Sequence, residues 1–250
     1  MSIFWNESSW PQIKEALASQ PPVFLPVGSI EQHGPHLPVG VDLFQAEQLA
    51  RGLAHSVGGF VLPHLPYGFS YNHMRFPGTI AVSGESLKCM VVEIGESLAA
   101  HGVTNLVLVN SHGGNSPALR MAAQIINQKH PPCRAIHLFW LEIIATELKE
   151  ILRQRFGTHA DESETSLMMY LYPELVDMDL VTDEIPPRDE NFLRDFLGQG
   201  YFSIQEETRS GVLGEATYAS AEKGRVIYDL AVEKLSAVLR AAMTQRETVN

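Results

Sequence analysis

The sequence predicts an α/β fold in which a mainly parallel β-sheet is sandwiched by helices. Short apolar runs rich in β-branched residues alternate along the chain with longer amphipathic segments. Such runs are typical of strands buried on both faces, and their alternation with helices indicates a parallel sheet. The 250 residues fit one unit with a sizeable core, so we expect a single domain over residues 1–250.

Each element is predicted from the spacing of its apolar residues and from the residues at its ends. Predicted helices have apolar residues every three or four positions, and Ser9 and Asp42 are of a type that caps a helix. The predicted helices cover residues 9–18, 43–56, 86–100, 141–155, 167–172 and 219–243, with another beginning at Ser116. The predicted strands cover residues 22–28, 60–66, 105–110 and 134–140, and residues 177–215 are expected to be irregular.

The composition limits the partners of the protein. The chain has 18 basic and 29 acidic residues and no run of five basic ones, so nucleic acid is not expected as a partner. It has no apolar run long enough to span a membrane and no secretory signal pattern. Cys89 and Cys133 form no Cys-x-x-Cys motif, and we expect both to be reduced core thiols of a cytoplasmic protein.

Residues 28–42 carry three side chains that could bind a metal. Glu31 and His33 are two positions apart, so in an extended segment their side chains point to the same side. Glycine and proline residues then bend the chain, which allows Asp42 to return to the same place. Imidazole and carboxylate together suit zinc, manganese or iron. Taken alone, Glu31 and His33 could be a solvated pair, and Asp42 could cap a helix while also binding a metal.

A second group of candidates follows the strand predicted over residues 105–110. His112 comes directly after this strand, and ligands collect at the carboxyl ends of strands in an open α/β sheet. Gly113 and Gly114 let the backbone pass close to a bound molecule. His112 is therefore a candidate metal ligand, and the two glycines are candidate substrate-binding residues.

The loop over residues 67–84 is long and rich in glycine, asparagine and proline. Long loops inside a compact domain are usually functional or disordered, and the aromatic content of this one argues against disorder. We interpret it as a wall on the substrate side of the site, with Tyr71 and His73 as candidate substrate-binding residues. An ordinary surface histidine is the alternative for His73.

A third group lies before the helical run 167–172. Acidic residues at the start of a helix interact favourably with its positive end, which would explain Glu162 and Glu164 without any function. His159 directly before them makes the group a candidate for chemistry, because imidazole transfers protons at neutral pH.

Several motifs together resemble the creatininase (creatinine amidohydrolase) family, whose members are di-metal amide hydrolases. The first is GSIEQHGPHLP at residues 28–38, followed shortly by Asp42. The others, in chain order, are YG at 67–68, FPGT at 76–79, NSHGGN at 110–115, HADESETS at 159–166 and AEKGR at 221–225. These motifs span nearly the whole chain in order, so the resemblance is specific for the family, although the family contains hydrolases of several amides and formamides.

The resemblance implies two divalent metal ions per chain, which would be zinc, manganese or iron. By this resemblance Asp42 bridges the ions, Glu31 and His112 hold one of them, and His33 holds the other. A hydroxide between the ions would attack the carbonyl carbon of a small-molecule amide, and His159 would pass a proton to the departing nitrogen. Family members are often hexamers, so a homo-oligomer, with the hexamer as one form, is the expected assembly.

The chain departs from creatininases two residues beyond His112. Creatininases have a metal-binding glutamate there, whereas this chain has Gly114. A carboxylate from elsewhere must then complete the second ion's ligands, and we expect Glu162 to bind the metal while Glu164 supports catalysis by orienting a histidine. Creatinine also becomes a doubtful substrate, so we expect cleavage of a creatinine-type or other cyclic amide, a formamide or a lactam.

Three other functions are weighed against this one. A metallopeptidase of the same family, acting on a short peptide, is the first alternative. A non-catalytic zinc protein is weaker, because structural zinc usually has a closed shell of Cys and His, and both cysteines lie outside the cluster. A nucleotide-binding protein is weaker still, since no Gly-x-Gly-x-x-Gly or phosphate loop follows any predicted strand.

Overall fold

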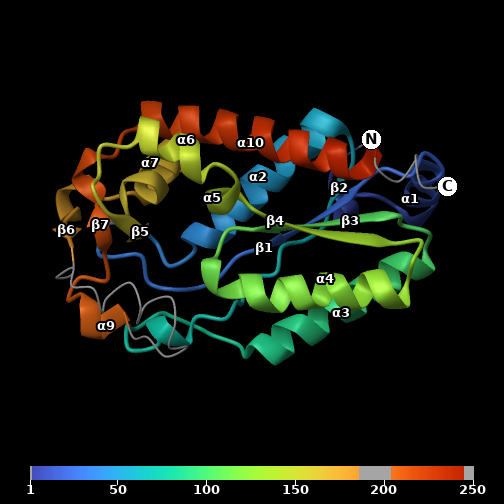
Figure 1. Ribbon diagram of the computed structural model, residues 1–250, viewed down its shortest axis with the longest axis horizontal. Helices are drawn as coiled ribbons and strands as arrows, with labels where there is room; N and C mark the ends of the chain where they lie inside the picture. The colour runs from blue at the N-terminus through green and yellow to red at the C-terminus, as the bar shows by residue number, and fades with distance from the viewer. Residues whose placement is uncertain (1, 186–203, 245–250) are drawn as a thin grey trace.

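A four-stranded parallel sheet lies at the centre of the molecule. The computed structural model describes residues 2–185 and 204–244. The strand order in this sheet is β2-β1-β3-β4, and every neighbouring pair is parallel (Figure 1). The strands are β1 (Val23–Val27), β2 (Phe60–Val61), β3 (Asn105–Asn110) and β4 (Arg134–Phe139).

Helices cover both faces of the sheet, which confirms the predicted sandwich. In Figure 1, α3 and α4 lie below the sheet, whereas α2 and α10 lie above it. The long helices are α2 (Val41–Val57), α3 (Gly84–Ala100), α4 (Ser116–Lys129), α7 (Glu162–Leu171) and α10 (Ala221–Thr244). The shorter ones are α1 (Trp10–Leu17), α5 (Trp140–Ile143), α6 (Ala145–Ile151) and α9 (Ile204–Glu207).

The residues of β3 alternate between two hydrophobic cores. Leu106 and Leu108 pack in the core that α3 and α4 form with the sheet. Val107 and Val109 pack in the core that α2 and α10 form on the opposite face. Because both faces are covered, every residue of β3 is buried, which explains why its sequence is a continuous apolar run.

A second, small antiparallel sheet lies beyond the carboxyl ends of the parallel strands. Its order is β5-β7-β6, with β5 at Gly157–His159, β6 at Asp183–Glu184 and β7 at Leu213–Glu215 (Figure 1). The prediction that residues 177–215 are irregular is therefore wrong for β6 and β7, and its part at residues 186–203 lies outside the described residues. This sheet brings His159 to the end of the parallel sheet where β1 and β3 terminate.

Three local predictions need correction. The strand predicted over residues 60–66 is regular only over β2, with an isolated bridge between Leu65 and Val27, because Pro63 and Pro66 have no N–H to donate. The helix predicted over residues 141–155 is divided into α5 and α6 and ends at Ile151. Cys133 is buried as expected, but Cys89 is exposed.

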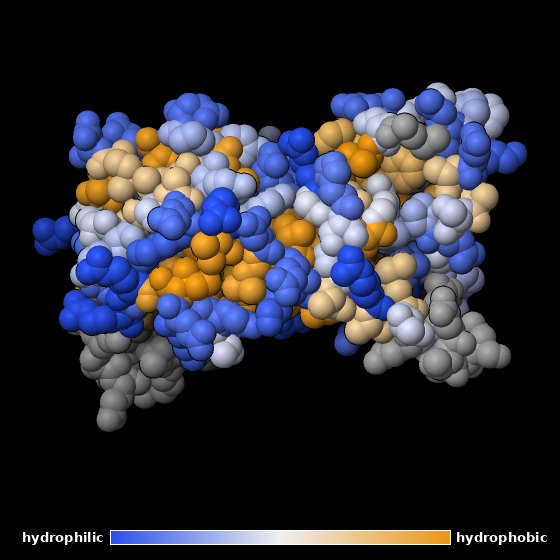
Figure 2. Space-filling model, turned by 90° about the horizontal axis from the view of Figure 1, so that it is seen from above, coloured by the Kyte–Doolittle hydropathy of each residue, from blue (hydrophilic) through white to orange (hydrophobic). Residues whose placement is uncertain are grey.

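The surface of the molecule carries both hydrophobic and hydrophilic residues. Figure 2, which views the molecule from above Figure 1, shows hydrophobic residues gathered in patches among hydrophilic ones. Within the part of the chain that the structure describes, no helix combines the length and the apolar character needed to cross a membrane.

Candidate metal centre

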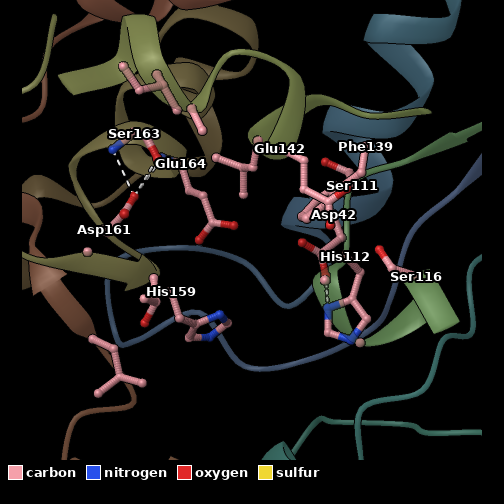
Figure 3. A pocket seen from close by; sticks show the side chains of 18 of the residues that line it. Asp42, Ser111, His112, Ser116, Phe139, Glu142, His159, Asp161, Ser163 and Glu164 are labelled. Atoms are coloured by element: carbon pink, nitrogen blue, oxygen red, sulfur yellow. Dashed lines mark hydrogen bonds and ion pairs between the residues drawn. The ribbon is translucent and has the colours of Figure 1, made fainter. Parts of the chain in front are cut away.

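Five buried polar side chains from distant parts of the sequence meet at the carboxyl end of the parallel sheet. Glu31 and His33 follow β1, Asp42 lies in the first turn of α2, His112 follows β3 and Glu164 lies in the first turn of α7. None of the five is more than 6% exposed. Figure 3 shows Asp42, His112, His159 and Glu164 around a common space. Of the seven residues predicted to be metal-binding or catalytic, the structure brings together six.

The shape of the chain after β1 brings Asp42 to this place. Gly28 lies so close to the start of α2 that a Cβ there would be 2.6 Å from the backbone nitrogen of Leu43. Gly34 has a φ of +69°, a conformation that side chains disfavour, and turns the segment back toward α2. Asn115 links two of the loops, since its side chain donates to Gly28 O and accepts from Phe69 N.

Asp42 lies between two histidines. Its Oδ1 is 3.4 Å from His33 Nε2, and its Oδ2 is 3.3 Å from His112 Nδ1. Glu31 Oε2 lies 3.2 Å from the same His112 nitrogen. Glu164 Oε2 lies 3.8 Å from His33 Nε2 on the other side. The five side chains therefore form a continuous row of oxygen and nitrogen atoms with Asp42 in the middle.

The outer nitrogen of each of these two histidines contacts a backbone carbonyl. His33 Nδ1 lies 3.1 Å from Glu31 O, and His112 Nε2 lies 2.9 Å from Phe69 O. A carbonyl only accepts hydrogen bonds, so the outer nitrogens carry the hydrogen. In the neutral rings the inner nitrogens, His33 Nε2 and His112 Nδ1, then offer lone pairs to the cluster. This is the usual orientation of metal-binding histidines, whose other nitrogen donates to a protein acceptor.

Three buried atoms of the cluster have no hydrogen-bond partner among the described residues: Glu31 Oε2, His33 Nε2 and Asp42 Oδ2. Such atoms are rare in folded proteins because an unpaired buried polar atom costs free energy. Donor atoms lie within 4.8 Å of one another in three overlapping groups, which are Glu31 with Asp42 and His112, His33 with Asp42 and Glu164, and Glu31 with His33 and His159. Imidazole and carboxylate donors of this kind fit a divalent transition metal.

The electrostatics of the cluster also favour bound cations. Burial alone would lower the pKa of His33, but Asp42 and Glu164 raise it to about 9. Burial likewise opposes the positive charge of His112, and Glu31 and Asp42 raise its pKa well above the ordinary value. Burial and the nearby charges of Asp161 and Asp42 raise the pKa of Glu164 to about 8, although His33 opposes this. The excess of buried carboxylates thus attracts protons where no metal is bound.

His159 and His73 both face the second carboxylate oxygen of Glu31. His159 Nδ1 lies 3.7 Å from Glu31 Oε1, and His73 Nε2 lies 3.5 Å from the same oxygen. Both rings are buried, so the alternative of a surface histidine for His73 is wrong. Burial lowers the pKa of His73 to about 4, and burial together with His33 lowers that of His159 well below its ordinary value. Both rings are therefore neutral at pH 7.

Glu164 lies at the cluster and Glu162 does not, which corrects the expectation that Glu162 is the metal-binding carboxylate. Glu162 is fully buried but lies outside the cluster, because its Oε1 pairs with Lys223 Nζ. Its Oε2 accepts from the backbone nitrogens of Arg153 and Gln154 at 2.8 and 2.6 Å. Glu164 takes the place beside His33 that Glu162 was expected to fill. The carboxylate of Glu162 instead ties the chain after α6 to the starts of α7 and α10.

A cavity of about 1080 Å³ opens onto the cluster. Gly113, Gly114 and His73, three of the residues expected to bind a substrate, line this cavity. Tyr71 does not line it; this side chain is about half exposed and packs edge-on against Phe69, which does.

Much of the cavity wall was not anticipated from the sequence. Lining residues from the β4–α6 region are Phe139, Leu141, Glu142, Ala145, Leu148, Lys149 and Leu152. Arg120 on α4 also lines the cavity and is paired with Glu142 at 2.6 Å. Nothing in the spacing of these residues marks them, because they come together only where α5 packs against β4 and α6 against α5.

Comparisons with known proteins place the chain in a family. The sequence model described as "Creatininase: Creatinine amidohydrolase" matches residues 6–239. Creatinine amidohydrolase of Pseudomonas putida is 30% identical over 96% of both chains. A mycofactocin precursor peptide peptidase of Mycolicibacterium smegmatis is 30% identical over 83% of this chain and 80% of its own.

Solved structures agree with these sequence relatives. A mutant creatininase described as "Zn-Zn type" has a TM-score of 0.86 and 28% identity, covering 97% of this chain and 98% of that one. "Creatininase Mn" has a TM-score of 0.87 at the same identity, covering 97% and 99%. Because the family model and the relatives cover almost the whole chain, and because the motifs of the sequence meet in one buried cluster, the protein belongs to the creatininase family.

Proposed function

We propose that the protein hydrolyses a carbon–nitrogen bond of an amide with two divalent metal ions. The observation that carries this proposal is the position of Asp42, whose two carboxylate oxygens face His33 and His112 from the middle of a buried row of ligands. Glu31 and His112 would hold one ion with Asp42, and His33 and Glu164 would hold the other. Such a pair of ions polarises a carbonyl group and lowers the pKa of bound water.

Zinc and manganese are the first candidates for the metal, since creatininase structures named for each share the fold at TM-scores of 0.86 and 0.87. Iron stays a further candidate on the same donor set. Gly114 has no carboxylate, and Glu164 offers one beside His33 instead. With Glu164 included, four side chains and the shared Asp42 are available to hold two ions.

His159 is suited to move the proton. Its Nε2 lies 2.6 Å from Gln32 O, so Nε2 carries the hydrogen and Nδ1 keeps its lone pair toward Glu31 and the cavity. Nδ1 can take a proton from the attacking water as the C–O bond forms, and can return it to the nitrogen as the C–N bond breaks. The lowered pKa of His159 supports this role, because a neutral ring can begin as the base.

The substrate is proposed to be a small non-peptide amide, which includes cyclic amides, formamides and lactams. Gly114 supports a substrate other than creatinine. A Cβ at Gly114 would be 2.5 Å from His112 Nε2 and would also overlap Phe69 O, so the creatininase glutamate does not fit this backbone.

A short peptide is the second candidate substrate. A cavity of about 1080 Å³ slightly exceeds the usual range for small-molecule sites, roughly 300–1,000 Å³. Lys149 lines it as well, and a cation of this kind could attract the terminal carboxylate of a peptide. A relative named as a peptide peptidase is consistent with this candidate.

A panel of substrates tests the proposal. The protein is stripped with a chelator, reloaded with zinc or manganese, and incubated with creatinine, lactams, formamides and short peptides while amine release is followed. Hydrolysis of at least one class by the reloaded protein, and none by the stripped protein or by Asp42→Asn, is the expected result. Absence of metal-dependent amine release from every class would refute the proposal.

A further inference from the structure

The side chain of Gln32 has only one orientation that satisfies its backbone partners. It lies between the two candidate ligands Glu31 and His33 and is 5% exposed. Its Oε1 accepts from Gly34 N at 2.9 Å, and its Nε2 donates to Gly211 O at 3.0 Å. An N–H can only donate and a carbonyl can only accept, so exchanging the amide oxygen and nitrogen would break both bonds. One hydrogen of Nε2 is therefore used by Gly211.

The second hydrogen of this amide has two candidate acceptors. Gln32 Nε2 lies 3.0 Å from His159 Nε2 and 3.1 Å from His73 Nδ1. The first contact cannot be the hydrogen bond, because His159 Nε2 already carries a hydrogen toward Gln32 O at 2.6 Å and has no free lone pair. The second hydrogen of Gln32 therefore goes to His73 Nδ1.

This bond determines which nitrogen of the His73 ring carries the hydrogen, and the result differs from the other histidines of the site. With Nδ1 accepting, the hydrogen of the neutral ring lies on Nε2. His73 Nε2 is the nitrogen that faces Glu31 Oε1 at 3.5 Å. As neutral rings, His33, His112 and His159 turn lone pairs toward the cluster, whereas neutral His73 turns an N–H toward it.

We propose that Gln32 is a positioning residue that makes His73 a hydrogen-bond donor in the site rather than a metal ligand. The N–H of His73 supports the Glu31 carboxylate from the side away from His112, and it can donate to a substrate group in the cavity that His73 lines. The role toward a substrate rests on the proposed function. The position of the hydrogen does not rest on it, because it follows from the protein's own hydrogen bonds.

Nuclear magnetic resonance of the imidazole nitrogens tests this directly. Long-range ¹H–¹⁵N spectra of the full-length protein at pH 7.5 separate protonated from bare ring nitrogens, in both the metal-free and the zinc-loaded forms. In the wild type we expect His73 to carry its hydrogen on Nε2. In Gln32→Met, which keeps the length of the side chain but removes the donor to Nδ1, we expect the fraction of His73 with its hydrogen on Nδ1 to rise, although Glu31 still faces Nε2.

Two controls make the outcome specific. His159 bonds to the backbone carbonyl of Gln32, so its Nε2 hydrogen should persist in Gln32→Met. Gln48→Met makes the same substitution where the amide donates to the Tyr172 hydroxyl at 2.6 Å, so it should leave the His73 signals unchanged. If Gln32→Met does not fold, Gln32→Glu removes the same donor.

Two results of the nuclear magnetic resonance experiment would overturn the proposal. A hydrogen on His73 Nδ1 in the wild type, or a ratio of the two forms that is unchanged in the Gln32 variants, contradicts it. Where a substrate is found, the loss of the Gln32 donor is expected to lower kcat by roughly 10–100-fold, the range for groups that orient a metal site, with a smaller change in KM. A chain that binds no zinc would contradict the proposed function, while the metal-free spectra would still decide the position of the hydrogen.

Discussion

Asp42 Oδ1 faces His33 Nε2 at 3.4 Å inside a fully buried site. The other oxygen of Asp42 faces His112, so this one carboxylate contacts ligands of both proposed ions. Asp42→Asn replaces one of the two oxygens with a donor that cannot coordinate a cation. We expect this variant to lose both ions, and elemental analysis of the desalted protein measures the loss.

The control for Asp42→Asn is Asp229→Asn, which changes an exposed aspartate paired with Arg225 on α10. This variant should keep the wild-type metal content. Retention of one full equivalent of metal by Asp42→Asn would mean that Asp42 serves only one ion and that the bridge is wrong.

Glu164 and Glu162 form a matched pair for a second prediction. Glu164→Gln should lower the metal content from about two ions to about one, because Glu164 is the carboxylate beside His33. Glu162→Gln should keep both ions but lower the free energy of unfolding by about 2 kcal/mol, because it weakens charged hydrogen bonds to Lys223 and to two backbone nitrogens. Elemental analysis and urea unfolding give the two readouts. The opposite pattern would return Glu162 to the metal site.

Removing the imidazole of His159 should slow catalysis without removing the metal. We expect His159→Ala to lower kcat by about two to four orders of magnitude, the range for losing a positioned proton carrier. Kinetics on a substrate found in the panel, together with metal analysis of the same sample, provide the measurement. Metal lost in proportion to activity would instead identify His159 as a ligand through Nδ1, and an unchanged rate would remove it from the mechanism.

We expect that no side chain fits at the position of Gly114. Even the Cβ of alanine would overlap Phe69 O, which accepts from His112 Nε2. Gly114→Ala should therefore destabilise the fold by about 1–3 kcal/mol, the usual cost of overpacking, and Gly114→Glu should not produce an efficient creatininase. Thermal unfolding and creatinine turnover are measured together. Gly102→Ala is not an equivalent control, because Gly102 has a φ of +87°, whereas Gly84→Ala at the start of α3 has ordinary contacts and should fold normally.

The strands of the main sheet and the helices around it could be predicted from the sequence, because their apolar residues follow long and regular patterns. Residues 105–110 and 43–56 carry patterns that only a buried strand and an amphipathic helix explain, and both are present as β3 and α2. The small sheet escaped prediction because β5 and β7 have three residues each and pair across a long stretch of chain. Three residues are too few to show an alternation of polar and apolar positions.

The candidate ligands could be predicted where they follow a strand within a few residues. The choice between Glu162 and Glu164 was not, because it depends on where α7 begins and on a partner from α10. Asp161 caps the helix by accepting from Ser163 N and Glu164 N, and Lys223 takes the carboxylate of Glu162. The role of Gln32 was equally hidden, since it depends on a contact with Gly211 far along the chain.

The metal content of the wild-type protein is the most direct test of whether two metal ions bind in the cluster and support hydrolysis. The protein is stripped with a chelator, reloaded with excess zinc, desalted and analysed for zinc against protein concentration, while amide hydrolysis is followed as zinc is titrated back. We expect about two zinc ions per chain, and activity that is complete at the second equivalent. A protein that retains no zinc, or that is fully active without any metal, would contradict it.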